Sequence, residues 1–206
     1  MTEHRDVAAF DQRAPGYESG RLGRMHHEIA DRALRLALAT APGPRRVLDV
    51  GCGTGYLLRS LAERLPQAEA LRGVDAAPAM VEVAAATAAS ERPGDSRLTF
   101  ARATAEQLPF ADGEFDLVVS TTSFDHWADQ GAGLAQCARV TRPGGTLVLV
   151  DQFSPLLAPT LLGTRRGKAR TPGRAEPLVR AAGYGSPRWH HVYALIIQGV
   201  TATKSR

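Results

Sequence analysis

The chain has few cysteines. Cys52 and Cys137 are the only two among 206 residues, too few for a disulfide framework or a zinc cluster built on cysteine. His, Asp, Glu and Cys residues at the spacing of metal ligands are missing too, so we expect no bound metal. This cysteine usage is typical of a reducing compartment, and we predict a cytoplasmic protein.

Long apolar runs are missing as well. No stretch approaches the ~20 apolar residues that cross a bilayer. The first residues, MTEHRDVAAFDQR, mix both charges and lack the apolar core of a secretory signal. We therefore expect neither a membrane span nor a cleaved leader.

Lysine is nearly absent, with Lys168 and Lys204 the only two. The net charge of +4 comes from arginines scattered along the chain, which indicates compositional bias and not a nucleic-acid partner. One segment is densely basic, and it contains Arg165, Arg166, Lys168, Arg170 and Arg174. This segment is either a solvated loop, the commoner case, or a flap that attracts an anionic substrate.

The length predicts one domain with a sizeable core. We expect this domain to cover residues 1–206. Its parts would be an N-terminal lid over 1–44, a ligand-binding core over 45–151, and a substrate-side loop with C-terminal strands over 152–206.

Hydrophobic periodicity and Gly/Pro breaks predict alternating strands and helices after a polar, irregular segment over 1–24. The expected strands are 46–50, 70–75, 98–101, 115–120 and 146–151, and the expected helices are 25–40, 55–65, 78–89 and 133–141. Strands joined through helices pair in parallel, with helices on both faces of the sheet. A loop over 152–175 and a helix over 175–182 follow. The last strands, 189–193 and 196–203, are too closely linked for a parallel crossover and should be antiparallel.

The most informative segment is LDVGCGTG, between the first expected strand and a helix. Gly51, Gly53 and Gly55 allow a sharp turn, so a ligand can lie against bare backbone beside a helix N-terminus. The spacing differs from the dinucleotide fingerprint G-x-G-x-x-G, because Tyr56 occupies the sixth position. Asp49, two residues before the first glycine, suits a ligand with a cationic amino group better than a pyrophosphate.

A second acidic residue, Asp75, ends the next strand. Ligands of open parallel sheets bind beyond the carboxyl ends of the strands, where a carboxylate can accept hydrogen bonds from ribose hydroxyls. Asp75 also precedes Pro78 and is a candidate N-cap of the next helix. We favour the ribose role because of the rest of the pattern.

These segments resemble the class I S-adenosylmethionine (SAM)-dependent methyltransferases, in the small-molecule branch of the ubiquinone and menaquinone methyltransferases. LDVGCGTG resembles the first motif of that family, GVDAAPAM the second, and ATAEQLPFADGEFDLVVS the third and fourth. RVTRPGGTLVLVD is similar to the segment that follows, and FDQRAPGYE to an N-terminal leader. The resemblance implies an α/β fold with a Rossmann-like, doubly wound, mostly parallel seven-stranded sheet and an antiparallel last strand.

The resemblance also implies SAM as cofactor and S-adenosylhomocysteine (SAH) as its product. Tyr17 would close over the SAM carboxylate and sulfonium, and Met80 would lie near the adenine. Thr104 stands where the family usually has an acid that contacts the adenine, so this contact would be shared among neighbouring groups. The expected cofactor-binding residues are Tyr17, Asp49, Gly51, Cys52, Gly53, Asp75, Ala76, Met80, Thr104, Ala105, Glu106 and Ser120.

Methyl transfer to a hydroxyl or ammonium requires a base. Our candidate is His126, which follows the fourth expected strand at the rim of the site; its structural alternative is a ring packed by Trp127 and bonded to loop backbone. The other candidate bases are Asp125, His26 and His27, the last two more often solvent-facing. Cys52 is expected to be a small residue beside the cofactor, Cys137 to lie in the core, and one of His190 and His191 to face inward with no role.

These features predict a methyltransferase of small-molecule or secondary metabolism that acts on a small-molecule acceptor as a monomer or homodimer. Ser120-Thr-Thr-Ser123 stands where nucleobase amino-methyltransferases carry an Asn/Asp-Pro-Pro-aromatic tetrad, which argues against DNA or RNA. The alternative is a SAM-binding protein of the same fold without methyl transfer, either a partner subunit or a non-methylating enzyme. A nicotinamide-dependent oxidoreductase is disfavoured by the glycine spacing.

Overall fold

The computed structural model describes residues 6–162 and 168–205. Its strands are β1 (Arg46–Val50), β2 (Ala70–Asp75), β3 (Leu98–Arg102), β4 (Phe115–Thr121), β5 (Thr141–Gln152), β6 (Tyr184–Tyr193) and β7 (Ile197–Lys204). Its α-helices are α1 (Val7–Arg13), α2 (Gly20–Thr40), α3 (Tyr56–Arg64), α4 (Pro78–Glu91), α5 (Gln130–Val140) and α6 (Pro172–Ala181). Short 3₁₀ segments are η1 (Ala14–Gly16), η2 (Phe124–His126) and η3 (Pro155–Leu162).

The strands form one seven-stranded sheet in the order β3-β2-β1-β4-β5-β7-β6. β1 pairs in parallel with β2 on one side and with β4 on the other, and β7 is antiparallel to both β5 and β6. The predicted fold class, including the antiparallel last strand, is therefore confirmed. The chain order reverses between β1 and β4, and this is where open α/β sheets bind ligands.

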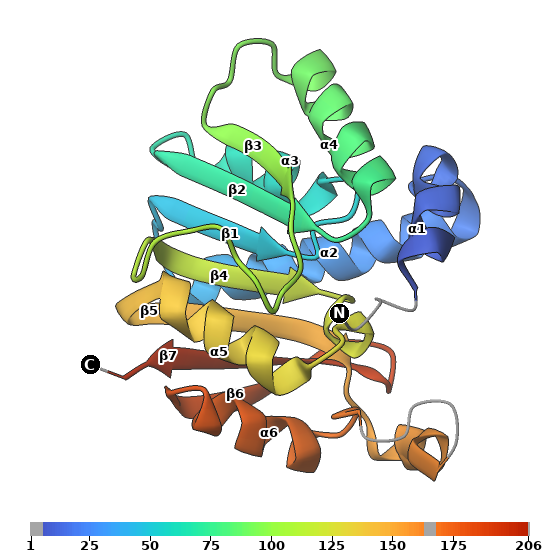
Figure 1. Ribbon diagram of the computed structural model, residues 1–206, viewed down its shortest axis with the longest axis vertical. Coiled ribbons are helices and arrows are strands. Elements are labelled where there is room, and N and C mark those ends of the chain that lie inside the picture. The colour runs from blue at the N-terminus through green and yellow to red at the C-terminus, as the bar shows by residue number, and fades with distance from the viewer. Residues whose placement is uncertain (1–5, 163–167, 206) are drawn as a thin grey trace.

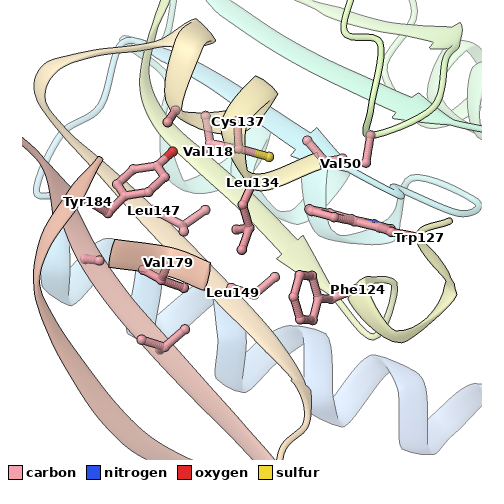
Figure 2. Packing of buried hydrophobic residues seen from close by; sticks show 14 of the residues in the cluster. Val50, Val118, Phe124, Trp127, Leu134, Cys137, Leu147, Leu149, Val179 and Tyr184 are labelled. Atoms are coloured by element: carbon pink, nitrogen blue, oxygen red, sulfur yellow. The ribbon is translucent and has the colours of Figure 1, made fainter. Parts of the chain in front are cut away.

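Helices cover both faces of the sheet, with α5 and α6 in front and α2 and α3 behind in Figure 1. β5 illustrates the consequence, since Leu147 and Leu149 belong to the core cluster under α5 and α6 while Val148 and Val150 belong to the opposite cluster. Figure 2 shows the first cluster, in which Leu134 of α5 and Val179 of α6 pack over the strands. Burial on both faces explains the nearly continuous apolar strand sequences.

The long helix α2 packs through one apolar stripe. Ile29, Ala33, Leu34 and Ala37 are buried at helical spacing, and the chain leaves the helix where Ala41-Pro-Gly-Pro begins. Each fully buried Ile or Leu contributes about 1.5–3 kcal/mol. The predicted end at Thr40 is right, but the helix starts at Gly20, five residues before the predicted start.

The prediction of an irregular segment over 1–24 is wrong for the part that the structure describes. α1 and η1 form there because Val7, Phe10 and Ala14 pack with Ala77 and Met80 at the start of α4. A seven-residue helix is not stable alone, so its formation depends on this tertiary packing. In Figure 1, α1 lies beside α4 at the edge where β1 and β4 end.

Other element boundaries also differ from prediction. α5 starts three residues early because the Asp129 carboxylate caps it by accepting from the Ala132 N–H. β5 starts at Thr141, which pairs with Phe115 before an irregularity that contains Gly144. β6 and α6 also begin earlier, and η3 occupies part of the predicted loop. No helix among the described residues is long and apolar enough to cross a membrane.

Candidate functional site

The glycine turn after β1 is held against β2. The N–H groups of Gly51 and Cys52 both donate to the Val74 carbonyl, at 2.8 and 3.0 Å. Gly51 (φ 76°) and Gly53 (φ 52°) are left-handed, but only the first is crowded. A Cβ on Gly51 would lie 1.8 Å from Ser123 Oγ, whereas the nearest atom to a Cβ on Gly53 is Tyr17 Cε1 at 4.0 Å. The turn therefore leaves open space above Gly53.

Asp75 is bonded by the backbone around it. Its Oδ2 accepts from the Gly53 N–H and its Oδ1 from the Ala77 N–H, both at 2.9 Å. The N-cap of α4 is Ala77, so the alternative role of Asp75 as N-cap is wrong. Burial raises the pKa of this carboxyl, and the backbone hydrogen bonds offset part of that rise. Each oxygen retains acceptor capacity for a ligand hydroxyl.

Asp49, at the end of β1, has a different environment. Its side chain is buried, and its Oδ1 has no hydrogen-bond partner in the described part of the chain. Burial first, and repulsion from Asp75 second, raise its pKa to about 8. A buried carboxyl with an unmade hydrogen bond is unfavourable for the free protein, and a cationic ligand would compensate for it.

Two adjoining pockets open at this edge of the sheet. The larger one, of about 670 Å³, contains Asp75 and is called the Asp75 pocket; the smaller one, of about 500 Å³, contains Asp49 and is called the Asp49 pocket. The residues that line both are Tyr17, Gly51, Gly53, Thr121 and Thr122. One elongated ligand can therefore occupy both pockets and pass over the glycine turn.

Most of the predicted cofactor residues lie at these pockets. The Asp75 pocket also contains Ala76, Met80, Thr104 and Ala105, and the Asp49 pocket also contains Cys52. Two predicted residues do not line either pocket. Ser120 is buried within β4, and Glu106 accepts a hydrogen bond from the Asp129 N–H at 3.0 Å. Thr121 and Thr122, directly after Ser120, occupy the place expected for it.

Tyr17 stands between the two pockets. Its ring stacks on His26, with ring centroids 4.8 Å apart. Burial and the nearby Asp75 raise the pKa of its phenol to about 12, so it stays a neutral hydrogen-bond donor. Its predicted contact with the cofactor stays a prediction, and its place in the chain is a segment whose helical structure was not predicted.

The two histidines of α2 face the Asp49 pocket, so the solvent-facing interpretation is wrong. His27 stacks on Tyr56 at 3.9 Å. His26 has a buried Nδ1 without a partner among the described residues, and burial lowers its pKa, so it is a neutral imidazole. The Oγ1 of Thr121 is a further buried polar atom without a described partner. His26, Thr121 and Asp49, each with a buried polar atom that lacks a described hydrogen-bond partner, thus line the same pocket.

His126 lines the Asp75 pocket. Its Nδ1 lies 2.6 Å from Asp6 Oδ2, and its ring meets the ring of Phe10 edge-on at 5.0 Å. The structural alternative, in which this ring bonds to loop backbone, does not hold, because its hydrogen-bond partner is a side chain. Asp6 and Phe10 were not predicted as site residues; the apolar spacing of Val7 and Phe10 was the available signal.

The neighbouring candidate base, Asp125, is not available. It is buried, and its Oδ1 lies 3.2 Å from the Nε of Arg170, which is buried as well. Lys168 donates to the Trp127 carbonyl. The solvated-loop interpretation of the basic segment is therefore wrong at these two positions, while Arg174 is exposed and Arg165 and Arg166 lie outside the described residues.

The two cysteines and the two histidines of β6 show no feature of a reactive group. Burial and nearby carboxylates raise the pKa of the Cys52 thiol, so it is a poor nucleophile. Cys137 is buried in the core, as predicted, with a pKa raised to about 12 by burial. His190 faces inward against Thr201 Oγ1 at 2.9 Å and His191 is exposed, which agrees with the predicted alternation. The described residues contain no group of three or more potential metal ligands.

Thr122 carries an unusual backbone conformation at the border of both pockets. Its φ is 54°, which is rare for a β-branched residue, and its N–H donates to the Val150 carbonyl at 2.8 Å. Thr121, Thr122 and Ser123 all line the Asp75 pocket. Backbone strain of this kind concentrates at functional sites.

Comparisons with known proteins identify relatives of this chain. The profile of the methyltransferase domain family matches residues 47–145. The chain is 39% identical to a demethylmenaquinone methyltransferase of Deinococcus radiodurans and 37% identical to one of Thermus thermophilus. The alignments cover 71% of this chain in both cases, and 59% and 64% of these relatives. The chain thus spans less than two thirds of their length.

The fold also matches solved structures across nearly the whole chain. The [4+2]-cyclase SpnF superposes with a TM-score of 0.78 at 20% identity, over 99% of this chain and 96% of that protein. A possible histamine N-methyltransferase of Thermotoga maritima superposes with a TM-score of 0.71 at 20% identity, over 97% and 99% of the two chains. At this level of identity the similarity establishes the shared fold.

Proposed function

The chain belongs to the class I SAM-dependent methyltransferase family, and from this premise we propose that it transfers a methyl group from SAM to a small-molecule acceptor. The observation that carries the proposal is the pair of adjoining pockets, with a bonded carboxylate in one and an unsatisfied carboxylate in the other. SAM has a ribose with two hydroxyls and a cationic amino group, which suit these two carboxylates in turn.

The residues of the Asp75 pocket would hold the adenosine part. Asp75 would accept hydrogen bonds from the ribose, in the orientation set by the Gly53 and Ala77 N–H groups. Met80 would provide an apolar surface for the adenine, and Thr104 its polar contact. The backbone hydrogen bonds of Asp75 are present in the free protein, so less conformational entropy is lost when the ligand binds.

The residues of the Asp49 pocket would hold the amino-acid part. Asp49 would bind the ammonium group, while Tyr17 and His26 would contact the carboxylate. The bound sulfonium supplies an activated methyl group, and this chain's task is to align the acceptor with it and to exclude water. Burial of Asp49 and Tyr17 indicates that water has limited access there.

We further propose that the acceptor is an aromatic small molecule, as the names of the two demethylmenaquinone methyltransferase relatives suggest. The carboxylates Asp6 and Asp75 at the larger pocket disfavour phosphate-rich nucleic acid. We also propose one domain over residues 1–206 that acts in the cytoplasm as a monomer or homodimer. The single sheet supports one domain, and the two buried free cysteines support a reducing compartment.

Calorimetric titration with SAM, SAH and NAD tests the cofactor assignment. We expect SAM and SAH to bind with micromolar dissociation constants and NAD not to bind. Gly53→Ala should weaken SAM binding at least about tenfold, because its methyl group would occupy the space that the ligand needs. Gly94→Ala is the matched control, since Gly94 is also left-handed and has no atoms near its Cβ position.

The outcomes separate the alternatives. Failure of both SAM and SAH to bind would overturn the methyltransferase proposal. Tight binding of SAM, without transfer to any of a panel of aromatic hydroxyl, amine and carbon acceptors, would favour the SAM-binding protein that transfers no methyl group. An equal loss of affinity in the Gly53 and Gly94 variants would show that backbone strain, and not contact with the ligand, is responsible.

A further inference from the structure

We propose that Asp6 and His126 form a proton-accepting pair for a neutral hydroxyl acceptor, a phenol or an enol, with Asp6 as the positioning residue. This proposal rests on the proposed methyltransferase function and deepens it. It arises from a contact between side chains 120 residues apart, at the edge of the Asp75 pocket.

The contact determines the chemistry of the ring. At 2.6 Å, His126 Nδ1 and Asp6 Oδ2 share a proton, and in the proposed pair the ring holds this proton as Nδ1–H. The other nitrogen, Nε2, then carries the lone pair. The described residues place no hydrogen-bond partner on Nε2, and the ring lines the pocket. This is the arrangement in which a carboxylate orients a histidine base.

The pair depends on how the N-terminal segment packs. Phe10 meets the His126 ring edge-on, and the Asp11 carboxylate accepts from the Ala79 N–H at 2.9 Å, which holds α1 at the start of α4. Glu18, at the other end of this segment, is paired with the buried Arg59 at 3.0 Å. The contacts of Phe10, Asp11 and Glu18 thereby fix the N-terminal segment, and with it Asp6, at the edge of the Asp75 pocket.

The lining indicates the charge of the acceptor. Among the described residues of the Asp75 pocket there are two carboxylates, Asp6 and Asp75, and no lysine or arginine. A carboxylate or phosphate on the acceptor would be repelled there. Phe10, Tyr17 and Trp127 supply apolar ring surfaces, so a flat neutral ring fits the lining better than an anionic one.

The need for a base distinguishes among neutral acceptors. A neutral amine attacks with its own lone pair, whereas a hydroxyl is a weak nucleophile until its proton is removed. In the proposed step the acceptor oxygen forms the O–C bond while its proton passes to His126 Nε2. The S–C bond breaks and its electron pair stays on sulfur. The products are a methyl ether, SAH and an imidazolium that faces the Asp6 carboxylate and later releases its proton to water.

The first test is the tautomer of His126, read from long-range proton–nitrogen NMR spectra of the SAH-loaded protein at pH ~8.5, about two units above the ordinary imidazole pKa. His126→Gln identifies its signals among the six histidines. We expect the Nδ1–H form in the wild type, its loss in Asp6→Ala, and its recovery in Asp6→Glu. Asp112→Ala, which removes an exposed carboxylate paired with Arg139, is the control and should leave the tautomer unchanged.

The second test is ligand binding in the presence of SAH. A naphthol should shift the NMR signal of His126 Nε2. It should also bind at least about tenfold more tightly than two matched compounds: methoxynaphthalene, which has no O–H to donate, and hydroxynaphthoic acid, which is anionic. Asp6→Ala should remove the preference for naphthol over methoxynaphthalene.

Two results would overturn the proposal. One is an Nδ1–H tautomer that persists in Asp6→Ala, which would mean that Asp6 does not orient the ring. The other is equal binding of naphthol and methoxynaphthalene, which would mean that Nε2 does not receive the acceptor's proton. If the wild type does not bind SAH, the proposed function is contradicted instead. The tautomer of His126 can then be measured without ligand, and it still tests whether Asp6 orients the ring.

Discussion

Asp49 and Asp75 end neighbouring parallel strands and lie on the same edge of the sheet, yet their environments differ. Asp75 accepts hydrogen bonds from two backbone N–H groups, which also shape the glycine turn and the start of α4. Asp49 is more deeply buried and has an oxygen without a described partner. Asp75 therefore contributes to the fold as well as to the proposed site, whereas the unmade hydrogen bond of Asp49 lowers the stability of the free protein.

The difference has a structural cause. Asp75 is followed by the start of α4, where the Ala77 N–H points back and donates to the Asp75 carboxylate. A helix N-terminus is a favourable place for a negative charge. Asp49 is followed by a turn whose N–H groups at Gly51 and Cys52 are already bonded to the Val74 carbonyl. The two aspartates thus differ because the N–H groups that follow Asp75 donate to its carboxylate, whereas those that follow Asp49 donate to the Val74 carbonyl.

Replacement of Asp75 should have the largest effect. Asp75→Ala removes the acceptor of two N–H groups and the proposed ribose contact. We expect the free energy of unfolding to fall by about 1–3 kcal/mol while the fold survives, and SAM affinity to fall roughly tenfold or more, about 1.4 kcal/mol. Denaturant unfolding and calorimetry measure the two effects. Unchanged SAM affinity would refute the ribose assignment.

Replacement of Asp49 should separate ligand binding from stability. Asp49→Asn keeps the size of the side chain and removes a buried acid, so the free protein should be as stable as the wild type or more so at neutral pH. SAM affinity should fall about tenfold or more, since a charge-assisted hydrogen bond contributes about 1.5–3 kcal/mol. A loss of stability similar to that of Asp75→Ala would contradict the contrast between the two carboxylates.

The raised pKa of Asp49, about 8, predicts a pH dependence. The folded carboxyl binds its proton more tightly than the unfolded one, so its contribution to stability is fully present below the ordinary pKa near 4 and is lost as pH rises toward 8. Binding of a cationic amino group favours the ionised form and should release close to one proton at pH 7. Calorimetry in buffers of different ionisation enthalpy measures this release, and Asp49→Asn should abolish it. Proton uptake on binding would contradict the assignment.

Replacement of His126 should have the smallest effect on the cofactor. The ring is hydrogen-bonded to Asp6 and meets Phe10 edge-on, and neither of these residues is assigned to the cofactor. His126→Ala should leave the dissociation constant of SAM unchanged. Loss of turnover alone would support its role as the base, and normal turnover with a hydroxyl acceptor would exclude that role.

Much of the cofactor site was predictable because its determinants are local. The strand, the alternating glycines and the acid before them lie within one short segment, and Asp75 follows at the end of the next strand. The outline of the sheet was predictable for the same reason, since each buried strand is a short apolar run. Ser120 and Glu106 do not line either pocket, but each is next in sequence to a residue that does, Thr121 and Ala105. The final direction of a side chain depends on backbone geometry such as that of Thr122, which a local sequence pattern does not predict.

By itself the sequence determined the alternation of strands and helices, the glycine turn and the two carboxylates, because periodicity and glycine position act over a few residues. Only the tertiary structure decided that α1 forms, that His26 and Thr121 face the Asp49 pocket, and that Asp6 meets His126. Such contacts join segments far apart in the chain. The contact of Asp6 with His126 depends on how α1, a short helix that is unstable alone, packs against α4, and no local pattern encodes that packing.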